Sequence, residues 1–365
     1  MKNILKIAII LLSAMSFSLA QAGELSVTGS AKASYVIVSS DSASSNAEQP
    51  KSLGIANEFN LGAGGELDNG MTWGYNINID GATTQDDGGL WISSSWGKIA
   101  LNVSQGGLEL SKAAALTATG SRGSDSGYGE NMFEEFSIGD AATNIAYSLP
   151  AGLLPFGIAA TVAYAPDTSS DSNQSVNDLV AANTGALTNP NAPAATAGVG
   201  STVAASGRTM TQYQVTAAPI DGLKVGASYG TFDTTGTLAQ DPESGSWYAA
   251  YKVGNAQIAY GKSYVALGIN ASSSNINTYE SVLGTKYSAL IAVNDNLSVS
   301  YGVEKSEATN VTNTTADVEM EVTQIGAAYT MGGLTLAVSM NDYQNVSYIT
   351  NKDTKSTAFY ASVAF

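Results

Sequence analysis

The chain has 365 residues, only 13% of them charged, with a formal charge of −16 and neither histidine nor cysteine. An acidic chain without a basic patch makes nucleic acid an unexpected partner, and the lack of cysteine excludes a disulfide framework. Histidine is the commonest general base and metal ligand. We therefore expect a protein that is not an enzyme and needs no cofactor and no metal.

The first 22 residues differ from the rest of the chain. Lys2 and Lys6 flank the start of an apolar run that continues to Leu19, and the residues at 20–22, Ala-Gln-Ala, fit the small-x-small pattern of a cleavage site. This pattern predicts a secretory signal peptide over 1–22 and a mature domain over 23–365. No later stretch has the continuous apolar length of a transmembrane helix.

The mature domain alternates apolar and polar residues with a period of two, which is typical of half-buried strands. Near the end of the chain, for example, Leu297, Val299 and Tyr301 share one face while Ser298 and Ser300 share the other. Sixteen strands are predicted in chain order, near 25–37, 53–67, 71–80, 90–95, 98–104, 143–149, 156–164, 209–217, 223–231, 246–253, 256–264, 281–293, 297–306, 318–330, 334–343 and 356–365.

Every second connection between these strands is short. The turns at 68–70, 254–255 and 294–296 are built from Asp, Asn and Gly, which supply the positive φ angles of tight hairpins. The intervening connections are longer, up to the stretch 165–208. This alternation places all the short turns at one end of an antiparallel sheet and all the long loops at the other.

A persistent apolar face over sixteen strands must be covered either by a second layer of protein or by lipid. Together with the signal peptide, the pattern favours an all-β fold: a closed antiparallel transmembrane β-barrel with a polar lumen, short periplasmic turns and long external loops. Closure is required because an open edge in hydrocarbon leaves backbone groups unpaired. The strand at 356–365 would then pair with 25–37. A soluble or surface β-repeat protein is the alternative, but its strands would recur at a fixed spacing.

Several stretches resemble the Gram-negative general diffusion porins. They are the signal peptide, the hairpin ELDNGMTW at 66–73, the strand start GLKVG at 222–226 and the terminal Phe365. The resemblance covers essentially the whole mature chain and is closest to the sixteen-stranded trimeric porins. It implies an outer-membrane homotrimer, surrounded by lipid and lipopolysaccharide, through which small hydrophilic solutes and ions diffuse passively. It also implies that Phe359, Val363 and Phe365 form the signal for outer-membrane assembly.

In that family the third external loop folds into the barrel and narrows the pore. The corresponding connection here is 105–142, and we expect its carboxylates to favour cations, although a solvated loop with ordinary charge is the alternative. The candidate acids are Asp125, Glu130, Glu134, Glu135 and Asp140. The family's usual Pro-Glu-Phe-Gly-Gly sequence has no close copy; residues 133–136, Phe-Glu-Glu-Phe, are the nearest approach.

Charged residues also occur at the alternate strand positions that are expected to face the lumen, here called the lumen parity. They are Lys32, Glu58, Glu66, Asp80, Lys98, Lys224, Lys252, Lys286 and Glu304. Porins of this family place basic residues, usually arginines, opposite the acidic loop. Only Lys32 and Lys98 lie on the first five predicted strands, so we expect a weak, lysine-built transverse field. Each lysine is equally well explained as an ordinary solvated wall residue.

Other interpretations of the barrel remain open at this point. The lumen could be plugged, leaving an adhesive or structural anchor, or the channel could be specific for one substrate. An outer-membrane enzyme would need a mechanism based on Asp/Glu or Ser/Lys. The loop 165–208, rich in Ala, Thr, Asn and Ser, is either a flexible external loop or a latch onto a neighbouring subunit.

Overall fold

The computed structural model describes residues 24–40, 51–80, 87–125, 132, 134–138, 143–166, 209–233, 238–266, 269–270, 279–310 and 317–365. The predicted signal peptide and nearly all of the 165–208 loop lie outside the described residues, as do Glu130 and Asp140. Within the described part of the chain, no helix combines the length and apolar character needed to cross a membrane.

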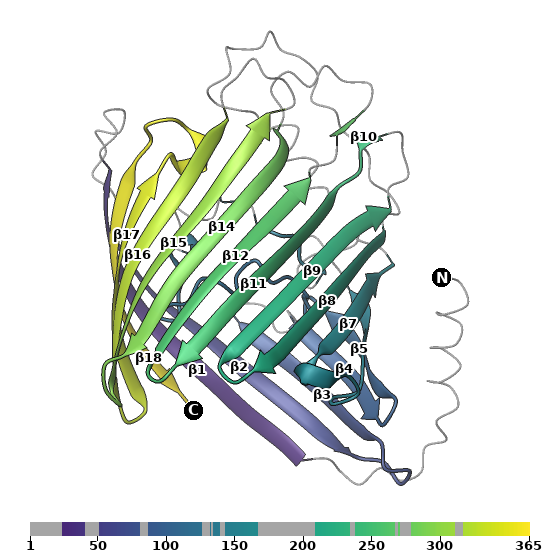
Figure 1. The fold of residues 1–365 in the computed structure, drawn as a ribbon. Helices are drawn as coiled ribbons and strands as arrows, with labels where there is room; N and C mark the ends of the chain where they lie inside the picture. The colour runs from purple at the N-terminus through teal and green to yellow at the C-terminus, as the bar shows by residue number, and fades with distance from the viewer. Residues whose placement is uncertain are drawn as a thin grey trace.

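Sixteen antiparallel strands close into a tilted barrel, which confirms the predicted fold class (Figure 1). Neighbours in sequence are neighbours in the barrel, and β1 pairs with both β2 and β18. The barrel strands are β1 (Glu24–Ser40), β2 (Ser52–Glu66), β3 (Thr72–Asp80), β4 (Asp87–Ser94), β5 (Gly97–Val103), β6 (Asn144–Ser148), β7 (Ala159–Ala165), β8 (Thr209–Ile220), β9 (Leu223–Asp233), β11 (Glu243–Val253), β12 (Ala256–Ala266), β14 (Tyr279–Ala292), β15 (Leu297–Asn310), β16 (Val318–Met331), β17 (Leu334–Gln344) and β18 (Thr354–Ala364).

Two further strands, β10 (Leu238–Gln240) and β13 (Ile269–Asn270), pair with each other outside the barrel. The sequence analysis missed them because segments of two or three residues carry no measurable alternation. Three single-turn 3₁₀ helices complete the described structure: η1 (Gly123–Asp125), η2 (Pro155–Gly157) and η3 (Val346–Tyr348).

The short turns depend on glycine. Gly222, between β8 and β9, has φ 77°, and Gly254, between β11 and β12, has φ 57°; few other residues adopt such angles without strain. A Cβ on Gly222 would also collide with the carbonyl group of Lys252. These turns hold successive strands in register at the short-turn end of the barrel.

The barrel closes between β1 and β18. Tyr35 lies opposite Phe359, and beyond the last residue of β18 the backbone of Phe365 still pairs with Gly29, with N···O distances of 2.8 and 2.9 Å. The Phe365 ring occupies the space that a Cβ on Gly29 would need and lies 5.6 Å from the Phe59 ring. Closure leaves the backbone groups of these strands paired, as a hydrocarbon environment requires.

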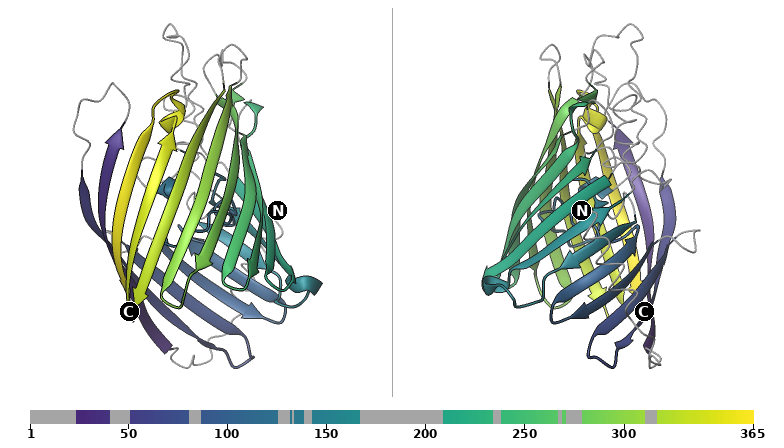
Figure 2. Two further views of the ribbon diagram at one scale, coloured as in Figure 1. Left: turned by 60° about the vertical axis from the view of Figure 1, so that its left-hand side comes forward. Right: turned by 90° about the vertical axis from the view of Figure 1, so that its right-hand side faces the viewer.

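The two faces of the barrel differ in chemistry and in exposure. On β14, Leu283 points outward and is 47% exposed, whereas Lys286 points inward and is only 3% exposed. Phe359, Val363 and Phe365 are all on the outward, exposed face. Inward side chains of β14 and β15 are buried because the segment that connects β5 to β6 packs against them inside the ring of strands (Figure 2).

Strand length and outer polarity vary around the barrel. The strands β14, β15 and β16 have 14 residues each, while β5 and β6 have 7 and 5, so β3–β7 end lower in Figure 1. Near the long-loop end, the outward positions of β15 are Lys305 and Glu307, which share the parity of exposed Tyr301. The outward positions at the same end of β2 are Leu53 and Ile55, which are 80% and 72% exposed.

Candidate pore constriction

The chain that follows β5 enters the barrel and runs along the inner side of the strands from β8 to β17, here called the loop-bearing wall. Its backbone is held by wall side chains. The N–H of Leu116 donates to Ser288 Oγ at 2.8 Å and that of Ala118 to Ser300 Oγ at 2.9 Å. Farther on, Tyr343 OH donates to the carbonyl oxygen of Gly123 at 3.0 Å.

Glycines on the lumen face of this wall make room for the loop. A Cβ on Gly226 would lie 2.8 Å from Leu110 Cδ1, one on Gly261 would lie 2.9 Å from Ala114 Cβ, and one on Gly326 would lie 3.0 Å from a Thr119 methyl. Glycine in a strand commonly marks such a close approach of another backbone. Gly and Ser at the lumen-facing positions of these strands were therefore the sequence signal for the path of the loop. The predictions from sequence did not include that path.

Glu135 joins the two legs of the loop to the wall. Its carboxylate accepts hydrogen bonds from the N–H groups of Leu110 and Ser111, at 2.8 and 3.2 Å, and from the hydroxyls of Ser228 and Ser246. The residue is only 6% exposed. A buried carboxylate with this many donors is a structural anchor, and it presents little charge to the lumen.

A second anchor is a network of four charged side chains. Arg122 Nη1 lies 2.7 Å from Glu134 Oε1, and Lys286 of β14 lies 3.0 Å from Glu304 of β15 and also pairs with Glu134. Glu304 in addition accepts a hydrogen bond from the N–H of Ser124 at 3.1 Å. The network therefore ties both legs of the loop to two adjacent strands.

The two loop members of this network, Glu134 and Arg122, have shifted pKa values. Burial alone would raise the pKa of Glu134, but the positive charges of Lys286 and Arg122 outweigh it and hold the pKa at about 2. Burial likewise disfavours the charge on Arg122, yet Glu134, Glu304 and Asp125 raise the pKa of its guanidinium further. Both loop side chains are thus charged at neutral pH, with their charges balanced inside the network.

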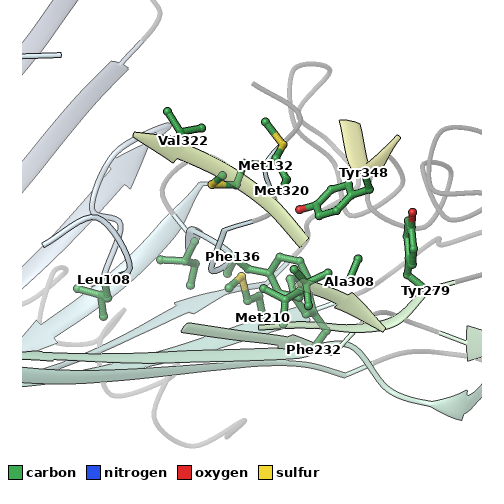
Figure 3. Close-up of a cluster of buried hydrophobic side chains, with 14 of the residues drawn as sticks. Leu108, Met132, Phe136, Met210, Phe232, Tyr279, Ala308, Met320, Val322 and Tyr348 are labelled. Atoms are coloured by element: carbon green, nitrogen blue, oxygen red, sulfur yellow. The ribbon is translucent and has the colours of Figure 1, made fainter. Parts of the chain in front are cut away.

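The return leg of the loop is held by an apolar cluster inside the barrel (Figure 3). The rings of Phe136 and Phe232 meet edge to face with centroids 5.2 Å apart, next to Met210. Ile138 is fully buried in the same cluster, which extends to Met320 of β16. The lumen is thus filled at the long-loop end of the loop-bearing wall, a feature that the sequence analysis did not predict.

The predicted acids therefore lie in different settings. Asp125 pairs with Arg122 at 2.5 Å, but its side chain is 43% exposed, whereas Glu134 and Glu135 are engaged as described above. Lys112 of the loop also approaches Glu134, at 3.7 Å. That these carboxylates set the selectivity of a pore stays a prediction.

The predicted wall residues are also separated. Lys32 donates to Ser121 Oγ of the loop and lies 4.2 Å from the centre of the Tyr360 ring, so it links β1 to the loop. Lys98 lies 5.1 Å from the centre of the Trp91 ring. Glu66, Lys224 and Lys252 are exposed near the short turns. For Asp80 the structure describes the backbone, which pairs with Glu58.

The strands β2–β6, here called the facing wall, lie across the lumen from the loop-bearing wall and meet the described loop at its start, where Asn76 and Asn144 donate to Gln105. Their lumen side carries side-chain amides gathered around Glu58, here called the amide cluster; the sequence prediction included Glu58 but none of the amides. The members of the cluster are Glu58, Asn60, Asn76, Asn78, Asn102 and Asn144. The amides occupy the alternate positions that face the lumen, so the same alternation that selects the charged wall residues also selects them.

The fold has close counterparts among solved structures. No protein-family model and no curated protein matches the sequence. The anion-selective porin from Comamonas acidovorans matches 94% of this chain and 100% of its own, with a TM-score of 0.64 and 12% identity. The chain has the fold of the porins. The same fold is found in a Salmonella typhi OmpF complex with daunomycin, which matches 94% of this chain and 98% of its own with a TM-score of 0.63 and 13% identity. It is also found in OmpT of Vibrio cholerae, which matches 96% of this chain and 100% of its own with a TM-score of 0.61 and 10% identity.

Proposed function

We propose that this protein is a porin in the outer membrane of a Gram-negative bacterium and allows small hydrophilic solutes and ions to diffuse passively. The observation that carries the proposal is the combination of an apolar, exposed outer surface with a polar lumen that an internal loop narrows from one side. Such a barrel needs lipid outside and water inside. The porin-like fold supports the same function.

The outer surface is consistent with a membrane that ends below the long loops. Outward apolar residues such as Ile291 and Ile325 give way on β15 to Lys305 and Glu307 toward the long-loop end. Charged residues are costly in hydrocarbon and tolerated near its boundary. We propose that lipid covers the apolar band and that lipopolysaccharide headgroups meet the charged positions above it.

We propose a preference for cations. The chain is strongly acidic, and of the three predicted loop acids that the structure describes, Asp125 has the most exposed side chain. Glu58 on the facing wall adds a second carboxylate, which accepts hydrogen bonds from the neutral amides of Asn60 and Asn78. Exposed carboxylates at a narrow point lower the electrostatic barrier for cations.

We also propose a homotrimer, with the subunits meeting at β1–β5. Leu53 and Ile55 keep the outer surface apolar up to the long-loop end of β2, and Leu90 and Leu101 continue it onto β4 and β5. An exposed apolar patch of this kind marks an interface. Changing both Leu53 and Ile55 to Asp is expected to convert trimers to monomers in detergent, as measured by light scattering. Unchanged trimers would contradict this interface.

A plugged barrel is the second candidate, because the apolar cluster around Phe136 fills part of the lumen. Planar bilayers separate the two candidates. For a porin we expect steady ion conductance, with a reversal potential in a KCl gradient that shows potassium to be more permeant than chloride. A protein that inserts but does not conduct would support the plugged barrel, and a chloride-selective reversal potential would contradict the cation preference.

A further inference from the structure

The amide cluster on the facing wall is organised by its own hydrogen bonds. Asn60 and Asn78 both donate to Glu58 Oε1, each at 3.0 Å. Farther round the wall, Asn76 donates to Gln105 Oε1 of the loop at 2.8 Å. These bonds orient the side chains before any solute arrives, so little ordering is left to be done on contact.

The cluster also has hydrogen-bonding capacity left over. The carbonyl oxygen of the Asn78 side chain is buried and has no hydrogen-bond partner in the part of the chain that the structure describes. The two amides that donate to Glu58 both reach the same carboxylate oxygen, Oε1. A buried acceptor without a partner costs free energy, so this part of the wall favours a solute that donates hydrogen bonds.

An aromatic ring lies beside the amides. Trp91 of β4 points into the lumen, and its ring covers Gly74 of β3, where a Cβ would collide with three ring atoms. On the same wall, Gly89 leaves space for the Asn76 amide, because a Cβ there would lie 2.8 Å from Asn76 Oδ1. Lys98 lies over the Trp91 ring and Lys32 lies on β1, so the amides are bordered by positive charges as well as by Glu58.

A solute that crosses the barrel has to pass this wall. The loop covers the lumen side of β8–β17 through its contacts with Ser288, Ser300 and Tyr343. The apolar cluster around Phe136 fills the same side at the long-loop end. Of the described residues, the loop meets the facing wall at Gln105, beside Asn76 and Asn144, so the lumen left beside the described loop lies against β2 and β3, where Glu58, Asn60 and Asn78 are.

We propose that Glu58, Asn60, Asn76 and Asn78 form a hydrogen-bonding subsite for neutral polyhydroxylated solutes, the class of sugars and polyols. Hydroxyl groups both donate and accept, which matches amide and carboxylate side chains. Hydrogen bonds from these side chains replace part of the hydrogen bonds to water that such a solute loses in a narrow lumen. Several weak contacts of this kind let a solute enter and also leave. The inference rests on the proposed function, since it needs an open channel.

The test compares a pentose with triethylene glycol, which has the same molecular mass but only two hydroxyl groups. Wild-type protein in proteoliposomes is expected to pass the pentose faster in a swelling assay. Changing both Asn60 and Asn78 to Leu keeps the side-chain volume similar and removes the amides. The pentose-to-glycol rate ratio is then expected to fall about fivefold, the effect of one ordinary hydrogen bond.

Thr161→Val is the matched control. Thr161 lies on β7, where its hydroxyl shares a hydrogen bond with Ser148 at 2.9 Å, away from the amide cluster; the variant removes one lumen hydroxyl and should leave the ratio unchanged. A ratio unaffected by the Asn60/Asn78 double variant would overturn the subsite.

A second measurement on the wild type needs no variant. Added pentose is expected to reduce the potassium current through single channels more than the same concentration of triethylene glycol does. Equal reduction by both solutes would overturn the subsite. Wild-type protein that conducts no ions would instead contradict the proposed function itself, so the two failures are distinguishable.

Discussion

The loop-bearing wall and the facing wall of this barrel are made from the same alternating strands but carry different lumen residues. The first presents Gly and Ser, which let a peptide backbone approach and hydrogen-bond, and among them Lys286, Glu304 and Tyr343, which bind the loop. The second presents Asn, Glu and Trp91, which reach into the lumen. The comparison teaches that small lumen side chains give an internal loop room to approach, and that charged and hydroxyl partners on the same wall hold it there.

The largest effect is expected from breaking the charge network of the loop-bearing wall. Glu304→Ala leaves Lys286 buried with one partner fewer and removes the acceptor of the Ser124 N–H. Losing one partner of a buried ion pair costs about 3–5 kcal/mol. We expect a lower thermal unfolding temperature and a larger, noisier single-channel conductance. Glu307→Gln, on the outer face of the same strand, is the control, and equal behaviour of the two variants would contradict the anchor.

Acid should weaken the same network reversibly. The pKa of Glu134 is lowered from 4.5 to about 2, so its contribution is fully present above the unfolded-state pKa and is lost as the pH falls through about 2. We expect loop anchoring, monitored as single-channel conductance, to be constant from neutral pH to about pH 4, and the conductance to change only near pH 2–3. A midpoint near pH 4.5 would contradict the ion pairing of Glu134.

A smaller effect is expected from adding one methyl group to each wall. Gly261→Ala places a Cβ 2.9 Å from that of Ala114 and should push the loop away, at about 1–3 kcal/mol. Gly54→Ala, on the lumen face of β2, has its nearest neighbour 3.8 Å away, at Ser34 Oγ. Thermal unfolding should be shifted by the first substitution and hardly by the second. Equal shifts would mean that the loop does not depend on the glycines.

The smallest effect is expected from Asp125→Asn. The side chain is partly exposed, and solvent and salt screen its charge. We expect the potassium-to-chloride permeability ratio from reversal potentials to fall about twofold at low salt and less at high salt. A neutral variant as selective as the wild type would leave Glu58 as the stronger candidate for the cation preference.

Much of the fold could be predicted because alternation is a local property. The strand predicted at 98–104 is β5 (Gly97–Val103), and the one predicted at 223–231 is β9 (Leu223–Asp233). Each strand has one face toward the outside and one toward the lumen, so a period of two marks it without knowledge of its neighbours. The pair β10 and β13 was missed because both strands are too short to show a period.

The candidate site was less predictable. Parity correctly placed Lys286 and Glu304 on the lumen face, but it could not say that they would pair with each other and with Glu134. It also treated Glu134 and Glu135 alike, although one belongs to an ion network and the other accepts hydrogen bonds from Ser228 and Ser246. Charge and parity describe a residue alone, whereas its role here depends on which partner reaches it.

The sequence by itself determined a closed barrel with an apolar outside, because alternation and turn residues act over a few positions. Only the tertiary structure decided which wall holds the loop and which wall stays open. The Ser124 hydroxyl bonds to Glu304, 180 positions later. Glycine and serine on a strand specify no partner until closure brings the wall and the loop together, and at that point shape and hydrogen bonding select one path for the loop.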